Sequence, residues 1–231
     1  MTQQPSPQSS HAPLARYAVL ISGSGTNLQA LIDAAERGEI DGEINVVISN
    51  RADAKGLERA NRHGIAHEVL DHKAFADREH YDAALMATID RRHVDLVVLA
   101  GFMRILTPGF VEHYAGRMLN IHPSLLPAYK GLHTHERVLE AGDKEHGCSV
   151  HFVTPELDGG PIIAQGKVPV FADDTPATLG ARVQQMEYPL YVRCVSLFMA
   201  GRLAMDAASG LVQLDGRPLK SGELDLAWSP A

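Results

Sequence analysis

The segment YAVLISGSGTNLQALIDAAERG, residues 17–38, decides the fold of this chain. Its beginning, Tyr17–Ser22, is a short apolar run that stops at a glycine, which is typical of a buried strand. From Asn27 onward the apolar residues recur at helical spacing, and Gly38 ends the predicted helix. A buried strand followed directly by such a helix is the repeating unit of a parallel sheet with crossover helices.

The same alternation of strands and helices continues through the first half of the chain. The run VDLVVLAG, residues 94–101, is apolar on both faces, so we expect it to be a central strand. Further strands are predicted over 44–49, 67–70 and 117–122, and further helices over 54–62, over 75–93 and from Thr107-Pro108 onward. The pattern predicts an α/β fold with an open, mostly parallel, Rossmann-like sheet and flanking helices.

The second half has a different pattern, because its strands alternate apolar and polar residues. Residues 147–154 and 162–170 alternate in this way and are joined by the turn 157–161, so we expect an antiparallel hairpin. A long helix is predicted over 175–197, and a weak hairpin begins at Leu203. The sheet should therefore carry an antiparallel C-terminal extension.

The composition indicates one domain with a single core. The chain has 231 residues, 45% of them hydrophobic, which is enough for one large domain. We expect that domain to span residues 16–215. Residues 1–15 are rich in Pro, Gln and Ser and are predicted to be a disordered arm, and residues 216–231 are predicted to be a polar tail.

Charge and cysteine content exclude several classes of protein. The formal net charge of -7 argues against a broadly basic surface for nucleic acid. The longest uncharged apolar stretch, residues 96–103, is far shorter than the roughly 20 residues that cross a bilayer. Two cysteines exclude a disulfide scaffold and fit a reducing compartment. We therefore expect a cytoplasmic protein that binds neither nucleic acid nor membranes.

The loop Ser22–Asn27 could bind an anion. Its glycines allow backbone N–H groups to point at a phosphate at the start of a helix. A dinucleotide fingerprint would need a third glycine where Leu28 stands, and an ATP-binding loop would need a lysine that is absent here. A phosphate monoester is the better ligand, and a plain strand-to-helix turn capped by Asn27 remains the alternative.

Asn120 and His122 are the candidate catalytic side chains. Alternation along the strand puts both on one face at its carboxyl end, where open α/β sheets bind their ligands. Together they offer a donor for an oxyanion and a group that can move a proton. Asp158 precedes Gly159-Gly160 and is an ordinary turn residue unless it approaches His122, where it would stabilise the imidazolium.

The twelve histidines do not form a recognisable metal motif. His133-Thr134-His135 lacks the matching ligands of known zinc sites, so we expect no metal.

Five segments in this order identify a resemblance. They are SGSGTNLQALID (22–33), SNRADAKGLERA (49–60), LAGFMRIL (99–106), LNIHPSLLPAYKGLHTH (119–135) and SVHFVTPELDGGPIIAQ (149–165). The set resembles the folate-dependent phosphoribosylglycinamide formyltransferase family of purine biosynthesis, over about residues 17–205. The resemblance implies direct formyl transfer from 10-formyltetrahydrofolate to the amine of 5-phosphoribosylglycinamide, without a metal.

The resemblance also implies which residues act. The half up to about residue 115 would bind the phosphoribosyl substrate, and the following half would bind folate and carry the catalytic groups. The matching catalytic residues are Asn120, His122 and Asp158. The phosphate and ribose set is Gly25, Thr26, Asn27 as the helix cap, and Glu187. The folate set is Arg78, Met103, Arg104, Ile105, Leu106, Asn120, Thr154, Pro155, Glu156, Leu157 and Asp158. Leu126-Pro127 is a candidate cis peptide.

Three alternatives stay open beside this interpretation. A formyltetrahydrofolate hydrolase shares the catalytic residues but is expected to carry an N-terminal regulatory domain. A methionyl-tRNA formyltransferase shares the Ser124–Pro127 loop but adds an RNA-binding domain. A non-catalytic nucleotide-binding module would need the glycine loop but no convergence of Asn120, His122 and Asp158. The sequence predicts small-molecule partners and leaves monomer and homodimer open.

Overall fold

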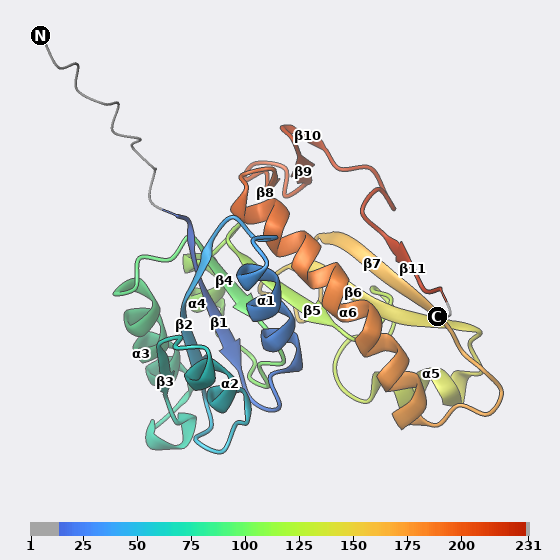
Figure 1. The fold of residues 1–231 in the computed structure, drawn as a ribbon, viewed down its shortest axis with the longest axis horizontal. Coiled ribbons are helices and arrows are strands. Elements are labelled where there is room, and N and C mark those ends of the chain that lie inside the picture. Colours follow the sequence, from blue (N-terminus) through green and yellow to red (C-terminus); the bar gives the residue numbers. More distant parts are fainter. Residues whose placement is uncertain (1–13, 230–231) are drawn as a thin grey trace, which may run out of the picture.

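A mixed eight-stranded sheet forms the centre of the molecule in the computed structural model, which describes residues 14–229 (Figure 1). Its strand order is β11-β7-β6-β5-β4-β1-β2-β3. The strands are β1 (Arg16–Ile21), β2 (Glu43–Ser49), β3 (His67–Val69), β4 (Leu96–Leu99), β5 (Met118–His122), β6 (Glu145–Phe152), β7 (Ile162–Pro169) and β11 (Leu226–Ala227). Most of the predicted arm lies outside the described residues.

The sheet has a parallel and an antiparallel part. Strands β3, β2, β1, β4 and β5 pair in parallel, whereas β6 is antiparallel to both β5 and β7. The predicted α/β class, with a mostly parallel sheet and an antiparallel extension, is confirmed. A small separate sheet contains β8 (Leu203–Met205), β9 (Val212–Leu214) and β10 (Arg217–Pro218).

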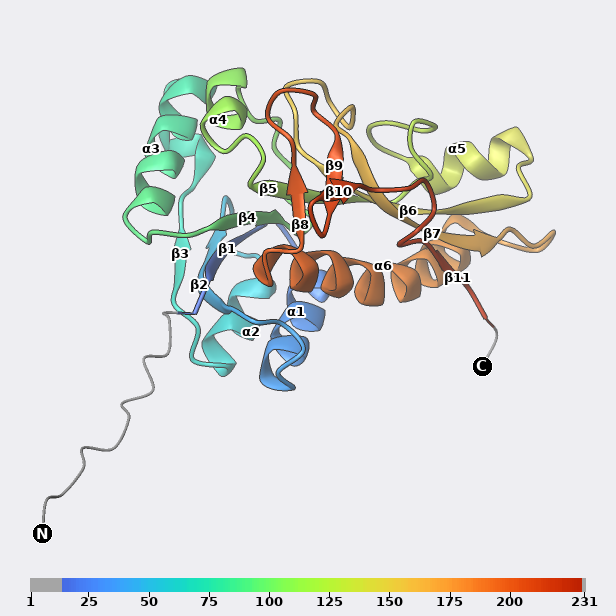
Figure 2. The same ribbon diagram turned by 90° about the horizontal axis from the view of Figure 1, so that it is seen from above.

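Helices cover both faces of the sheet (Figure 2). They are α1 (Thr26–Glu36), α2 (Gly56–Arg62), α3 (Arg78–Asp90), α4 (Pro108–His113), α5 (Thr134–Ala141) and α6 (Pro176–Met199). Helices α1, α2 and α6 pack on one face, and α3 and α4 pack on the other. Strand β4 contributes Leu96 and Val98 to the first core and Val97 and Leu99 to the second, as expected for a central strand.

Two helices differ from the sequence prediction. Helix α3 begins at Arg78 instead of residue 75, because the Asp77 side chain accepts a hydrogen bond from the His80 N–H and caps the helix. Helix α5 was not predicted at all. His133 before it and Gly142 after it both have left-handed backbone angles, with φ of 58° and 71°, so the chain turns sharply at each end.

The C-terminal segment is part of the fold and not the predicted polar tail. Residues of β10 join the small sheet, and β11 pairs in parallel with β7 at the edge of the large sheet. Leu224 is buried, and the Trp228 ring packs edge-on against Phe171 at a centroid distance of 6.3 Å. The boundary at residue 215 is therefore wrong, because apolar side chains beyond it are buried.

The carboxyl ends of β1, β4 and β5 lie at one edge of the sheet. The loops that follow these strands are the glycine loop, the segment 100–107 and the segment 123–133. The Leu126-Pro127 bond in the last of these is cis, as the resemblance implied. The topology thus brings the predicted binding and catalytic segments to one place.

Candidate active site

His122 and Asp158 meet at the end of β5, and Asn120 is linked to them through His151, whose Nε2 atom lies 3.1 Å from Asn120 Nδ2 and 3.9 Å from Asp158 Oδ1. The His122 Nδ1 atom lies 3.5 Å from Asp158 Oδ2, and the two side chains are only 7% and 9% exposed. Asp158 reaches this position from the turn after β6 with a φ of 48°, a left-handed angle that Asp tolerates better than most residues. Its Oδ2 atom also accepts a hydrogen bond of 2.9 Å from the Gly131 N–H.

The His122 ring is held from its other side. Its Nε2 atom lies 2.9 Å from the Tyr129 carbonyl oxygen, which can only accept, so Nε2 carries a proton. That contact turns Nδ1 towards the Asp158 carboxylate. Both ring nitrogens therefore face oxygen acceptors.

Asn120 is held by a residue that the sequence did not single out, His151. The strand register places the two residues opposite each other, and Asn120 Nδ2 lies 3.1 Å from His151 Nε2. The His151 Nδ1 atom faces the Phe152 carbonyl oxygen at 2.9 Å and must donate to it. Burial lowers the pKa of His151, so the ring is neutral and its Nε2 atom accepts from the Asn120 amide.

The glycine loop begins helix α1 differently from the prediction. Gly25, with a φ of 68°, is the N-cap residue, and Thr26 is the first helical residue. Asn27 is therefore not the cap. Its Nδ2 atom instead donates to Glu187 Oε2 on α6 at 2.8 Å, while Gln184 Nε2 donates to Thr26 Oγ1 at 2.9 Å. The start of α1 and the middle of α6 form one polar site.

This polar site contains two buried groups whose loss of contact with water is not fully offset by hydrogen bonds within the protein. Burial raises the pKa of Glu187, against the smaller lowering effect of its hydrogen bond from Asn27. The Asn27 Oδ1 atom is buried and has no partner within residues 14–229. A ligand hydroxyl could donate to either oxygen, as expected for a site that binds a sugar.

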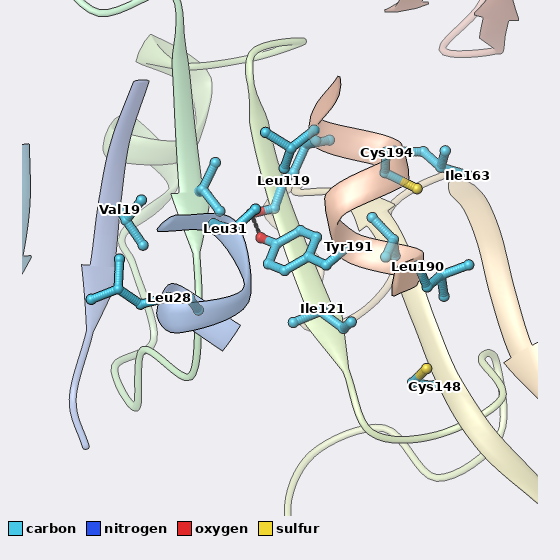
Figure 3. Packing of buried hydrophobic residues seen from close by; sticks show 14 of the residues in the cluster. Val19, Leu28, Leu31, Leu119, Ile121, Cys148, Ile163, Leu190, Tyr191 and Cys194 are labelled. Carbon is cyan, nitrogen blue, oxygen red and sulfur yellow. Dashed lines mark hydrogen bonds between the residues drawn. The ribbon is translucent and has the colours of Figure 1, made fainter. Parts of the chain in front are cut away.

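Helix α6 is fixed on the sheet one turn after Glu187. The Tyr191 hydroxyl shares its single proton between the carbonyl oxygens of Leu99 and Leu119, which lie 2.9 and 3.0 Å away. Figure 3 shows the Tyr191 ring reaching β5 within the buried apolar cluster. These hydrogen bonds fix the position of α6 along the sheet, and with it the position of Glu187 opposite the start of α1.

Helix α2 holds the outer side of the glycine loop. The Gly56 N–H donates to the Gly23 carbonyl at 3.0 Å, and Arg59 Nε donates to the Ser24 carbonyl at 2.8 Å. A Cβ atom on Gly25 would lie 2.6 Å from the Gly56 Cα, so the two segments touch through their glycines. Sequence reasoning gave Gly56 and Arg59 no role, although both belong to the quoted segment 49–60.

The predicted folate residues come from three segments. Met103–Leu106 lie between β4 and α4, and Thr154–Asp158 follow β6. Met103, Ile105 and Leu157 expose 68%, 56% and 51% of their surface, unusually large fractions for apolar side chains. Leu106 packs against the same core cluster as Val153, the residue before Thr154. Arg104 lies over the Tyr81 ring at 5.8 Å.

Arg78 is the remaining member of the predicted folate set. It is exposed at the first turn of α3, and within residues 14–229 no hydrogen bond or ion pair joins it to the other members. Its role stays a prediction. In the same described part of the chain, no group of three or more His, Cys, Asp or Glu side chains has the geometry of a metal site. None of the described helices is both long and apolar enough to cross a bilayer.

The fold and this site define a formyl transferase. The chain belongs to the formyl transferase family, whose model matches residues 15–195. It is 58% identical over 201 residues to the phosphoribosylglycinamide formyltransferase of Escherichia coli (strain K12). The aligned residues cover 87% of this chain and 94% of that protein. The family predicted from the sequence segments is thereby confirmed.

Two further comparisons agree with this assignment. A solved structure of the phosphoribosylglycinamide formyltransferase from Coxiella burnetii, in complex with CHES, is 49% identical with a TM-score of 0.86, over 94% of this chain and all of that one (100%). The trifunctional purine biosynthetic protein adenosine-3 of Homo sapiens is 46% identical over 200 residues, which cover 87% of this chain and 19% of that longer protein.

Proposed function

We propose that this protein transfers the formyl group of 10-formyltetrahydrofolate to the amine of 5-phosphoribosylglycinamide, in de novo purine biosynthesis. The observation that carries the proposal is the convergence of Asn120, His122 and Asp158 at the sheet edge of a formyl transferase fold, with His122 Nδ1 at 3.5 Å from Asp158 Oδ2. A module that only binds a nucleotide would not require these three side chains to meet.

The reaction begins when the neutral amine attacks the formyl carbon and forms a C–N bond. The carbonyl oxygen becomes an oxyanion. One N–H of the Asn120 amide is used by His151, and the second can donate to this oxyanion. Protonated His122 supplies the other donor through Nδ1, because the 3.5 Å separation from Asp158 Oδ2 is too long for a good hydrogen bond and leaves that N–H available. A single donor of this kind is typically worth about 3 kcal/mol of transition-state stabilisation.

Collapse of the tetrahedral centre completes the transfer. The bond between the formyl carbon and N10 of the folate breaks, and N10 gains a proton as it leaves. The attacking amine loses one proton and N10 gains one, so the reaction is balanced when Asp158 accepts the amine proton through a water molecule and passes it on to N10. No side-chain nucleophile is needed, because both cysteines are buried and burial raises the pKa of their thiols.

Substrate binding follows from the two halves of the site. The phosphate is bound by backbone N–H groups of Gly25, Thr26 and Asn27 at the start of α1, and Glu187 accepts from the ribose hydroxyls. The folate lies between segments 103–106 and 154–158, with its glutamyl tail near Arg78 and Arg104. That tail is in solvent, so raising the salt concentration should weaken its contribution to binding.

The decisive experiment measures folate deformylation spectroscopically with and without phosphoribosylglycinamide. We expect turnover to require the amine and to yield the N-formyl product in equal amount. Turnover that is independent of the amine would instead indicate a hydrolase. We place the enzyme in the cytoplasm, in line with two buried cysteines that form no disulfide.

A further inference from the structure

Two buried polar side chains, Ser22 and Asn50, meet where β1 and β2 end. Ser22 Oγ donates to Asn50 Oδ1 at 2.6 Å, and the two residues are only 5% and 2% exposed. Burying polar groups so fully is costly unless each is bonded, so this pair is expected to have a defined structural purpose. Neither residue belongs to the catalytic or phosphate-binding sets described above.

The pair holds one particular backbone group. Ser22 Oγ also accepts a hydrogen bond of 2.8 Å from the Met103 N–H. Because the Asn50 carbonyl oxygen takes the hydroxyl proton, a lone pair of Ser22 Oγ is left pointing at Met103. The His72 ring lies beside Asn50, with Nδ1 at 3.1 Å from the Asn50 backbone carbonyl and at 3.2 Å from Asn50 Nδ2.

The supported segment is the one that we assign to folate. Its far end is held in the same way, because the Thr107 N–H donates to buried Asp82 Oδ2 at 2.6 Å. Between these two anchors, the N–H and carbonyl groups of Arg104, Ile105 and Leu106 have no protein partner in the described part of the chain. The segment therefore offers a row of free backbone groups, fixed at both ends, to a planar heterocycle with several donors and acceptors.

We propose that Ser22 and Asn50 are positioning residues for the formyl-folate co-substrate, acting through the backbone of Met103. The inference rests on the proposed function. Displacing these backbone groups by a fraction of an ångström would misalign several hydrogen bonds to the folate at once. The phosphate loop has its own supports in Gly56 and Arg59, so loss of the Ser22 hydroxyl leaves that loop in place.

The test compares Ser22→Ala with the intact enzyme in steady-state kinetics. We expect the KM for 10-formyltetrahydrofolate to rise about 10-fold, while the KM for phosphoribosylglycinamide and kcat change less than about 2-fold. The Kd of 10-formyl-5,8-dideazafolate, measured by titration calorimetry, should rise by the same factor as the folate KM. Ser22→Thr keeps the hydroxyl and should restore most of the affinity.

Asn50→Leu is the second variant and should show the same selective loss. The double variant should be no worse than either single one, because both substitutions remove the same support. Ser196→Ala is the matched control. It removes a hydroxyl that donates to the Glu39 carbonyl at 2.7 Å, between α6 and the end of α1, and should leave both KM values unchanged.

Any one of three results would overturn the inference. They are an equal rise in both KM values, an unchanged folate Kd in Ser22→Ala, and additive effects in the double variant. If the intact enzyme itself failed to bind the folate analogue, the proposed function would be wrong, which is a separate outcome.

Discussion

His151 shows how one residue can set the geometry of Asn120, a side chain that we propose to be catalytic. Its neutral ring accepts from Asn120 and donates to Phe152, so the Asn120 amide cannot flip without losing a hydrogen bond. The amide N–H that remains free then points in one direction. Orientation of this kind is the main requirement for a donor that must meet a short-lived oxyanion.

Replacing His151 by Leu should therefore lower kcat more than it raises either KM. We expect kcat to fall about 10- to 100-fold, since the Asn120 donor is present but no longer oriented. His151→Gln, which can offer an oxygen to the same amide, should lose less. His113→Leu, a change at an exposed histidine of α4 whose ring pairs with Asp90 and not with Asn120, provides the control. An equal loss in the Leu and Gln variants would argue against an orienting role.

Glu187 illustrates a conflict between binding and stability. Burial raises its pKa, so the folded state favours the protonated form. A group with a raised pKa contributes stability at low pH and loses it as the pH rises through that pKa. Glu187→Gln should therefore be at least as stable as the intact protein at pH 8, by thermal unfolding.

The same variant should bind the phosphoribosyl substrate less tightly, because an amide accepts from ribose hydroxyls less strongly than a carboxylate. We expect about a 10-fold higher KM for that substrate and an unchanged folate KM. A variant that lost stability but kept its KM would contradict the assignment of Glu187 to the ribose.

At the scale of elements, helix α5 is attached to strand β6 by a pair of histidines. His135 Nδ1 lies 3.0 Å from His146 Nε2, so the two nitrogens share a single proton. Burial lowers the pKa of both rings, and that of His146 falls to about 4. The contact needs a lone pair on one of the two facing nitrogens, so it is lost when both rings are protonated.

Acid should therefore weaken the folded protein through this pair. Between pH 6.5 and about 4, the unfolded chain binds a proton at His146 that the folded chain does not. The free energy of unfolding therefore decreases as the pH is lowered through this range. The contribution amounts to at most about 3 kcal/mol. His146→Gln should flatten this part of the pH profile in urea unfolding, whereas His67→Gln on exposed β3 should not. Equal slopes in all three proteins would refute this account.

Elements buried on both faces were predictable from sequence, whereas elements defined by special backbone angles were not. The run 96–101 is apolar throughout because β4 lies between two helical layers, so its position followed directly from composition. Helix α5 escaped prediction because left-handed His133 gives no apolar signal. His151 escaped for a different reason: its role depends on the register of β5 against β6, and no local pattern contains that register.

At the scale of the whole molecule, the C-terminal segment closes one edge of the large sheet. Strand β11 pairs with β7, the Trp228 N–H donates to the Lys167 carbonyl at 2.9 Å, and Asp225 Oδ1 accepts from the Gln165 N–H at 2.8 Å. An uncovered strand edge is a template for pairing with another chain. The segment therefore protects the molecule as well as extending its core.

Removing residues 222–231 should expose this edge. We expect the melting temperature to fall by about 5 °C, since the change removes buried Leu224 and a set of backbone hydrogen bonds worth roughly 2 kcal/mol in total. Light scattering should also show concentration-dependent association of the shortened protein. The proposed catalytic side chains lie on β5 and in the turn after β6, outside the removed segment, so kcat measured well below the melting temperature should be preserved. A shortened chain that stayed monomeric with an unchanged melting temperature would show that β11 has no protective role.

Trp228 makes the pairing of β11 with β7 visible in tryptophan fluorescence. It is the only tryptophan in the chain, and its ring packs against Phe171 at the end of the molecule formed by β7 and β11. Excitation at the red edge of the indole band therefore reports on the docking of one short strand. Emission should shift to longer wavelength when β11 detaches, before the rest of the sheet unfolds, and should serve as a built-in label for that single event.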